Sequence, residues 1–181
     1  MGKSSALHDM LRLGVILMIF CAVAGLALAK TYDFTEERIA AQQEEELHRA
    51  LKDAVPEAED FETMEKDGHT VYLGRANGNL MGIVVVSEAQ GYGGPIKMFV
   101  ATDESGVVKK AIILSLSETP GLGMKVDDPK FLSQFEGKGP DDAFLVKKDV
   151  QAISGATVSS RAVATAVKEA VSVASSLKGS I

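Results

Sequence analysis

The sequence predicts an α+β protein: one N-terminal transmembrane helix, then a small, mainly antiparallel sheet packed with helices. Three observations predict this class. Residues 13–29 are uncharged and apolar, residues 70–115 contain paired strand patterns joined by turn signals, and residues 159–177 carry a helical apolar stripe. Strands and helices are segregated along the chain rather than alternating, which is typical of α+β domains.

The apolar segment predicts a membrane anchor. As a helix, residues 13–29 would span roughly 26 Å, which is near the minimum for crossing a bilayer. Met10 and Leu11 extend the apolar run, and Arg12 can reach the interface with its long side chain. We therefore expect a transmembrane helix at residues 10–29.

Charges on either side of this segment predict its orientation. Lys3 and Arg12 precede it, whereas a single Lys30 follows it and acidic residues come soon after. By the positive-inside rule, residues 1–9 are expected in the cytoplasm and the C-terminal domain on the outer, periplasmic face of the inner (plasma) membrane. A cleaved signal peptide is the alternative, because Ala27-Leu28-Ala29 fits a cleavage site. Both alternatives export residues 30–181.

Residues 30–66 are expected to form a helical stalk and linker. Within them, residues 35–54 have a helical pattern with Thr35 as the cap and a thin apolar stripe, and Pro56 stops the helix. We interpret this segment as a solvated stalk, and a binding helix is the alternative.

The folded domain is expected at residues 67–181, with four or five strands. Asn77-Gly78 is a strong hairpin signal between strand patterns, and a second strand pair follows. Asp128-Pro129 opens a short helix, with aspartate as the cap. The expected strands cover residues 70–75, 80–86, 96–101, 107–115 and 143–147, and the expected helices cover residues 128–135 and 159–177.

Composition excludes several functional classes. The chain has 181 residues and a formal net charge of −6, so binding to nucleic acid through a broadly basic surface is not expected. The single cysteine, Cys21, excludes an intrachain disulfide and a cysteine-based metal centre. The histidines His8, His48 and His69 lack metal-ligand spacing, and neither a Walker-type loop nor a Ser/His/Asp signature is present. We expect no catalytic residue and no metal held by this chain alone.

The segment SGATVSS, at residues 154–160, is the most informative one. Its small residues let another molecule approach the backbone closely. A hydroxyl at a helix N-terminus lies beside unpaired N–H groups and the positive end of the helix dipole, which favour phosphate. Thr157 is therefore a candidate to contact or carry a phosphate group. An ordinary helix start, capped by Thr157 or Ser159, is the alternative.

Two further loops combine glycines with polar or aromatic side chains. Residues 118–123, ETPGLG, suit a wall around a flat ring, with backbone N–H groups for heteroatoms and Leu122 packing on the ring. Residues 91–95, GYGGP, place Tyr92 among glycines. A tight turn and a hairpin connection are the respective alternatives.

Together, SGATVSSRAV, ETPGLG and GYGGPI resemble the FMN-binding domain of the G subunit of the Rnf ion-translocating electron transport complex. The C subunit of the sodium-translocating NADH:quinone oxidoreductase is similar but usually longer. The resemblance covers residues 10–181, and the three motifs occur in the family's order and spacing.

The resemblance implies an electron-carrier subunit of a membrane-bound, ion-translocating ferredoxin:NAD⁺ oxidoreductase. FMN would be esterified through its phosphate to Thr157 by a Mg²⁺-dependent flavin transferase that uses FAD, and other membrane subunits would be partners. The cofactor contacts implied are Ser154, Gly155 and Ala156 around the phosphate, Glu118, Thr119, Gly121, Leu122 and Gly123 near the isoalloxazine, and, less directly, Tyr92, Gly93 and Gly94.

This sequence departs from the family pattern at one position. The transferase motif often has an aspartate three residues before the serine, where this chain has Gln151, with Asp149 two residues earlier. Two other functions stay open: a covalent-FMN subunit of another exported electron chain, such as the sodium-translocating NADH:quinone oxidoreductase, and a non-redox anchored binding module.

Overall fold

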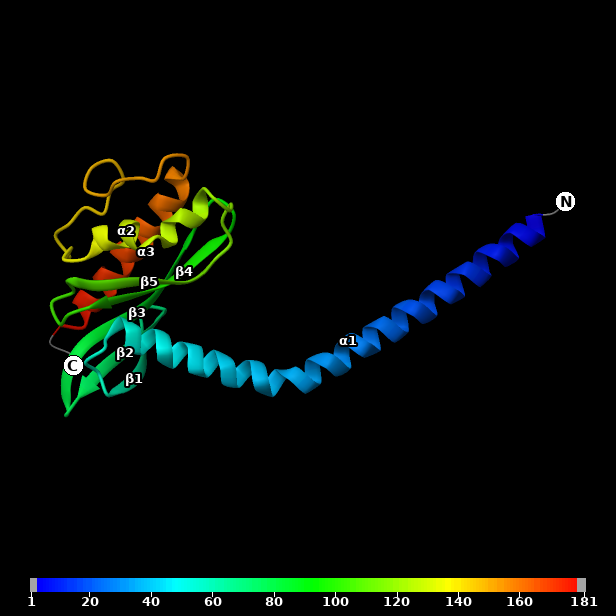
Figure 1. The fold of residues 1–181 in the computed structure, drawn as a ribbon, viewed down its shortest axis with the longest axis horizontal. Helices are drawn as coiled ribbons and strands as arrows, with labels where there is room; N and C mark the ends of the chain where they lie inside the picture. Colours follow the sequence, from blue (N-terminus) through cyan, green and yellow to red (C-terminus); the bar gives the residue numbers. More distant parts are fainter. Residues whose placement is uncertain (1–2, 179–181) are drawn as a thin grey trace. The chain divides into compact units, whose positions relative to one another are not determined.

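The computed structural model describes residues 3–178, and the chain divides into two units at Leu47 and His48. The first unit is the N-terminal part of a long helix, α1 (Lys3–Ala54) (Figure 1). The second unit holds the last turns of α1 and the α+β domain. The predicted fold class is thereby confirmed. Residues 35–54 are helical as expected, but the predicted cap at Thr35 is wrong, because α1 continues through this position and the Thr35 hydroxyl donates back to the carbonyl oxygen of Thr31 (2.9 Å).

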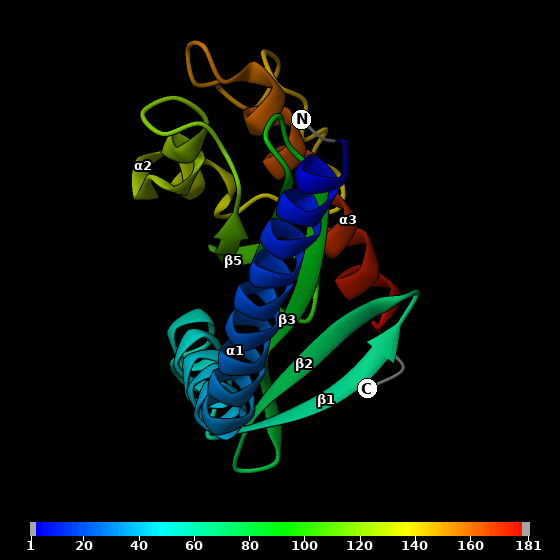
Figure 2. The same ribbon diagram turned by 90° about the vertical axis from the view of Figure 1, so that its right-hand side faces the viewer.

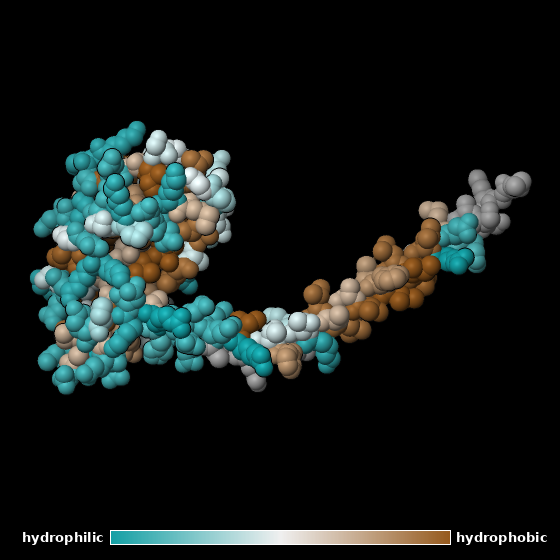
Figure 3. Space-filling view, viewed as in Figure 1, coloured by the Kyte–Doolittle hydropathy of each residue, from teal (hydrophilic) through white to brown (hydrophobic). Residues whose placement is uncertain are grey.

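The first unit carries the apolar segment. Among the described residues, one stretch, His8–Tyr32, is long and apolar enough to cross a membrane, with a mean hydropathy of 2.4 over an 18-residue window. None of that window is buried by the protein itself, and Figure 3 shows apolar side chains covering this stretch of the helix. The stretch includes the predicted span at residues 10–29 and, by its length and composition, is a candidate membrane span.

A five-stranded antiparallel sheet forms the centre of the second unit, with its strands in chain order. The β2–β3 turn confirms the predicted hairpin, since Asn77 (φ 52°) and Gly78 (φ 79°) both have the positive φ that a two-residue type I′ turn requires. The strands are β1 (Asp60–Lys66), β2 (His69–Ala76), β3 (Asn79–Gln90), β4 (Pro95–Thr102) and β5 (Val108–Leu116).

One face of the sheet is covered by α3 (Thr157–Ser176), which lies across β3 and β4 (Figures 1 and 2). The apolar stripe predicted for this helix is buried there, together with alternate residues of the strands, as a pleated sheet requires. The short elements η1 (Gly123–Asp127), α2 (Pro129–Leu132) and η2 (Ser133–Phe135) follow β5. Asp128 accepts a hydrogen bond from the N–H of Lys130 (2.8 Å), which confirms the predicted cap.

The other face of the sheet receives the end of α1 and the turn that follows. Val55 and Ala58 lie against the Cα atoms of Gly82 and Gly74, where a Cβ would come within 3.0 Å and 2.9 Å of their side chains. Leu51 and Ala54 are buried in the same region. The Lys110 ammonium donates to the carbonyl oxygen of Asp53 (3.2 Å) and to its carboxylate (2.7 Å), which pairs an unsatisfied group at the helix end.

Two elements differ from the sequence prediction. Strand β1 lies in residues predicted to belong to the linker. The prediction missed it because this half-exposed edge strand, DFETMEK, has little apolar alternation. The strand expected at residues 143–147 is wrong: this segment forms only an isolated bridge between Val146 and Val150. Phe144 (φ 53°) and Lys147 (φ 71°) both interrupt the extended backbone.

Candidate functional site

A cavity of about 560 Å³ lies where the three predicted loops meet. The loops leave β3 and β5 and enter α3, and these ends lie close together in the domain (Figure 1). This volume is within the range of roughly 300–1,000 Å³ that is usual for cofactor sites. The lining residues are Tyr92, Glu118, Thr119, Leu122, Gly123, Gly155, Ala156, Thr157, Val158 and Ser159.

Most of the predicted site residues therefore share one cavity. Ser154 and Gly121 are exposed on the loops beside it, and Gly93 and Gly94 lie against Ser117, the residue before Glu118. Val158 and Ser159 were not among the predicted contacts. They could have been found from helical geometry, because the first turn of a helix presents consecutive residues around its open end.

The start of α3 offers unpaired backbone donors to this cavity. Thr157 is the first helical residue, and the preceding Ala156 makes no side-chain cap. Within residues 3–178, no hydrogen bond uses the backbone N–H of Thr157, Val158 or Ser159. A cap by Thr157 or Ser159, one alternative from the sequence, is therefore not formed, and the open helix end suits an anion.

Ser160 fixes the loop that precedes this helix. Its hydroxyl is fully buried, donates to the carbonyl oxygen of Ala156 (2.9 Å) and accepts from the N–H of Ile153 (3.1 Å). This side chain thus ties the helix to both sides of the SGAT turn. The sequence showed Ser160 only as part of a polar motif, because a hydroxyl's partners depend on the path of the loop.

Glu118 joins two of the loops. The residue is 7% exposed, and Oε1 accepts hydrogen bonds from the N–H of Tyr92 (2.7 Å) and, at longer range, of Gly93 (3.5 Å). A Cβ on Gly91 would overlap Oε1, and a Cβ on Gly123 would overlap Oε2. The glycines on both sides are thus explained by the close approach of this carboxylate.

The rim of the cavity is apolar and open. Tyr92, Leu122 and Val158 are exposed, with Tyr92 at 75%. No Lys, Arg or His side chain lines the cavity among the described residues, and no group of three His, Cys, Asp or Glu there is placed to hold a metal ion. The lining therefore offers apolar contact, backbone donors, hydroxyl groups and one carboxylate.

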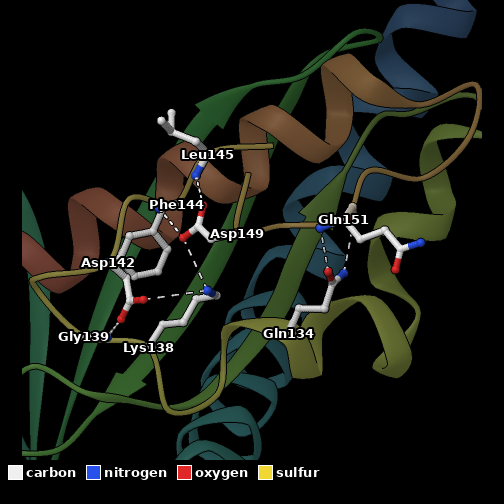
Figure 4. A network of polar contacts seen from close by, with 8 residues as sticks. All are labelled: Gln134, Lys138, Gly139, Asp142, Phe144, Leu145, Asp149 and Gln151. Carbon is white, nitrogen blue, oxygen red and sulfur yellow. Dashed lines mark hydrogen bonds and ion pairs between the residues drawn. The ribbon is translucent and has the colours of Figure 1, made fainter. Parts of the chain in front are cut away.

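A polar network fixes the chain upstream of SGAT (Figure 4). Asp149 accepts from the N–H of Leu145 (2.6 Å) and Phe144 (2.8 Å) and from the Lys138 ammonium (3.3 Å). Burial raises the pKa of Asp149, but the two N–H donors and the Lys138 ammonium lower it by more, so the pKa lies below its usual value. This carboxylate is committed to folding the loop.

Gln151 follows this network, and its backbone is held by Gln134. Its N–H donates to Gln134 Oε1 (2.8 Å), and its carbonyl accepts from Gln134 Nε2 (3.4 Å). The side chain of Gln151 points away from Gln134 and is exposed (Figure 4). The backbone of residue 151, three positions before Ser154, is therefore held by main-chain contacts, and the side chain of Gln151 is free for a partner.

Comparisons with known proteins match both parts of the chain. A family model described as the FMN-binding domain matches residues 91–172, which include all three loops, and one described as the RnfG N-terminal region matches residues 1–53. A crystal structure of NqrC from Shewanella oneidensis is similar to this chain at 25% identity, with a TM-score of 0.50, over 69% of this chain and 70% of that one.

Relatives of nearly equal length share about a third of the sequence. The G subunit of the proton-translocating ferredoxin:NAD(+) oxidoreductase complex of Clostridium ljungdahlii is 33% identical, over 94% of this chain and 95% of that protein. The G subunit of the ion-translocating oxidoreductase complex of Methanosarcina acetivorans is 34% identical, over 91% and 94%. The G subunit of the Na(+)-translocating ferredoxin:NAD(+) oxidoreductase complex of Acetobacterium woodii is 31% identical, over 90% of each chain.

Proposed function

The chain belongs to the G-subunit family of ion-translocating ferredoxin:NAD⁺ oxidoreductase (Rnf) complexes, and from this premise we propose that its FMN is joined by a phosphodiester to Thr157. The family, its FMN-binding domain and its place in a multi-subunit oxidoreductase are those that the three motifs predicted. The chain is an electron-carrier subunit of such a complex. Similarity to G subunits over nearly the full length favours this function over the alternative of a C subunit.

One observation carries the proposal of covalent attachment. Thr157 is half-buried at the cavity wall, at the first position of α3, and the N–H groups of residues 157–159 have no partner in the described chain. A phosphodiester at this hydroxyl would keep one negative charge beside those donors. The helix end stabilises such a charge by roughly 0.3–1 kcal/mol when exposed, and by more when partly buried.

The attachment step uses only the hydroxyl of this chain. Thr157 Oγ1 would form a bond to the phosphorus of the FMN phosphate in FAD, and the P–O bond to AMP would break. AMP leaves, and the hydroxyl proton passes to the flavin transferase or to solvent. The unpaired N–H groups in the first turn of α3 would hold the phosphate oxygens during this exchange.

FMN supplies the redox chemistry when bound. Apart from the tether, the chain provides binding surface: Leu122 and Val158 offer apolar contact to a flat ring, and Gly155 lets the phosphate come close to the backbone. Because the rim is open and Tyr92 is exposed, a ring held there would be accessible to a redox partner in the complex.

The orientation of the chain follows from the charges beside its anchor. Lys3 precedes the apolar stretch and Arg12 lies near its N-terminal end, so we infer that the N-terminus is in the cytoplasm and the flavin domain on the outer face. A covalent tether suits this location, because a flavin released outside the cell could not be recaptured.

The experiment is expression of the full chain with an active flavin transferase, followed by denaturing electrophoresis under ultraviolet light. We expect a fluorescent band, with the added mass of an FMN phosphoryl group on the peptide that contains Thr157. Thr157→Val should give a dark band, because the hydroxyl is replaced by a methyl group of similar size. Thr63→Val is the control, since Thr63 is an exposed threonine on β1.

Two results would contradict the proposal. One is a Thr157→Val protein that stays fluorescent after denaturation. The other is an unmodified Thr157 peptide from cells whose transferase modifies a known substrate.

A further inference from the structure

Glu118 has one carboxylate oxygen without a partner. Oε1 is paired with the backbone of Tyr92, but Oε2 is fully buried and has no hydrogen-bond partner in the described chain. Glu118 also forms no ion pair there. A buried carboxylate oxygen without a hydrogen-bond partner destabilises the fold by more than a typical hydrogen bond stabilises it. The stability of the fold therefore does not explain why Oε2 is buried without a partner.

The carboxylate lies directly behind the wall of the flavin cavity. Gly123 and Glu118 both line the cavity, and a Cβ on Gly123 would overlap Oε2. Glycine therefore leaves no side chain between this oxygen and the open space. No cationic side chain lines the cavity in the described chain, so no side chain there neutralises the charge of the carboxylate.

The cavity lining is thus positive on one side and negative on another. The open N-terminus of α3 is positive and suits the phosphate. Glu118, on the loop after β5, is negative and disfavours a phosphate nearby. A ligand with an anionic end and a neutral ring is oriented by this pair, with its phosphate at Thr157 and its ring toward the Glu118 loop.

We propose that Glu118 is a positioning residue that joins the two loops of the cavity and keeps the reduction potential of its flavin low. The inference rests on the proposed FMN site. A negative charge in a poorly hydrated wall disfavours the uptake of an electron nearby, and the interaction is stronger there than in water. The unpartnered Oε2 is the feature that lets this charge act on the cavity.

The test is the midpoint potential of the flavin in the full-length, loaded chain, measured by spectroelectrochemistry. Glu118→Gln keeps the shape and one acceptor for the N–H of Tyr92 but removes the charge, so the potential should shift to a more positive value. Glu118→Asp keeps the charge and should stay near the wild-type potential. Glu136→Gln is the matched control, because Glu136 is exposed and outside the cavity lining.

Every outcome bears on the proposal. A Gln variant that takes up no flavin, while the Asp variant carries it, would assign the charge to flavin uptake rather than to the potential and would overturn the proposal. Three other results would also overturn the proposal: equal potentials in all variants, equal shifts in the Gln and Asp variants, or loss of flavin from both. Each would mean that Glu118 only shapes the loops. Failure of the wild-type chain to carry flavin is a different result, which contradicts the proposed function instead.

Discussion

Leu122 lies against the Cα of Gly155: a Cβ placed on Gly155 would come within 3.1 Å of Leu122 Cδ2. This contact joins the ETPGLG and SGAT loops, which are far apart in the sequence. Gly155 also has φ +80°, a conformation that residues with a Cβ rarely adopt. Glycine is therefore required here both for the backbone conformation and for space.

Gly155→Ala should impair flavin attachment more than it lowers the stability of the domain. The positive φ costs an alanine about 1–2 kcal/mol, and Leu122 must move to admit the methyl group. We expect slower or incomplete flavin attachment, measured as the fluorescence of the denatured band relative to total protein, and a lower unfolding temperature.

Gly139→Ala is the control for that substitution. Gly139 has no positive φ, and a Cβ there would meet only Val107 at 3.4 Å, an ordinary contact distance. Full attachment in Gly155→Ala would show that the SGAT turn tolerates a side chain, contrary to our account.

Sequence patterns predicted the parts of this fold that depend on local chemistry. The Asn77-Gly78 hairpin, the Asp128 cap and the stripe of α3 all form as expected, because turn geometry, capping and amphipathicity are encoded within a few residues. The convergence of three loops on one cavity was predicted only through their resemblance to a known family.

Contacts between distant residues could not be read from local patterns. Glu118 and Tyr92 are 26 positions apart, and nothing around either residue indicates that the carboxylate of one accepts from the backbone of the other. The same holds for β1, whose pairing with β2 comes from tertiary packing rather than from its own weak alternation.

Gln151→Asp should speed flavin attachment without changing the fold. The contacts between residue 151 and Gln134 use the main chain of residue 151, so its side chain can change freely. The family motif often has aspartate here, whereas Asp149 is committed to Phe144 and Leu145. Attachment would be followed as fluorescence over time with a purified transferase and FAD.

The unfolding temperature of Gln151→Asp should equal that of wild type. An unchanged rate of attachment would mean that the transferase does not contact this side chain. A lowered unfolding temperature would mean that the side chain, rather than the main chain, anchors the loop.

Asp149→Asn should destabilise the domain in a pH-dependent way. Asn keeps one acceptor oxygen but loses the charge that pairs with Lys138, which we expect to cost about 1–2 kcal/mol at pH 7. Because the pKa of Asp149 is lowered in the folded state, the carboxylate stabilises the fold above its unfolded pKa, near 4. That contribution is lost as pH falls through the folded-state value.

Urea unfolding of Asp149→Asn and wild type at pH 7 and below pH 4 measures this effect. The difference in the free energy of unfolding should be present at pH 7 and shrink in acid. A difference that is the same at both pH values would assign the effect to packing rather than to ionisation.

Gly82→Ala should loosen the end of α1 from the sheet. A Cβ on Gly82 would come within 3.0 Å of Val55 Cγ2 and 3.2 Å of the carbonyl oxygen of Thr102. Val55 or the backbone at Thr102 would therefore have to move. Overpacking of this kind costs about 1–3 kcal/mol. Val55→Ala in the same chain makes room for the new methyl group, so the double variant should recover part of the loss, although Val55→Ala alone is destabilising. Thermal unfolding of the four proteins gives the coupling energy, and strictly additive losses would show that Val55 and Gly82 are not in contact.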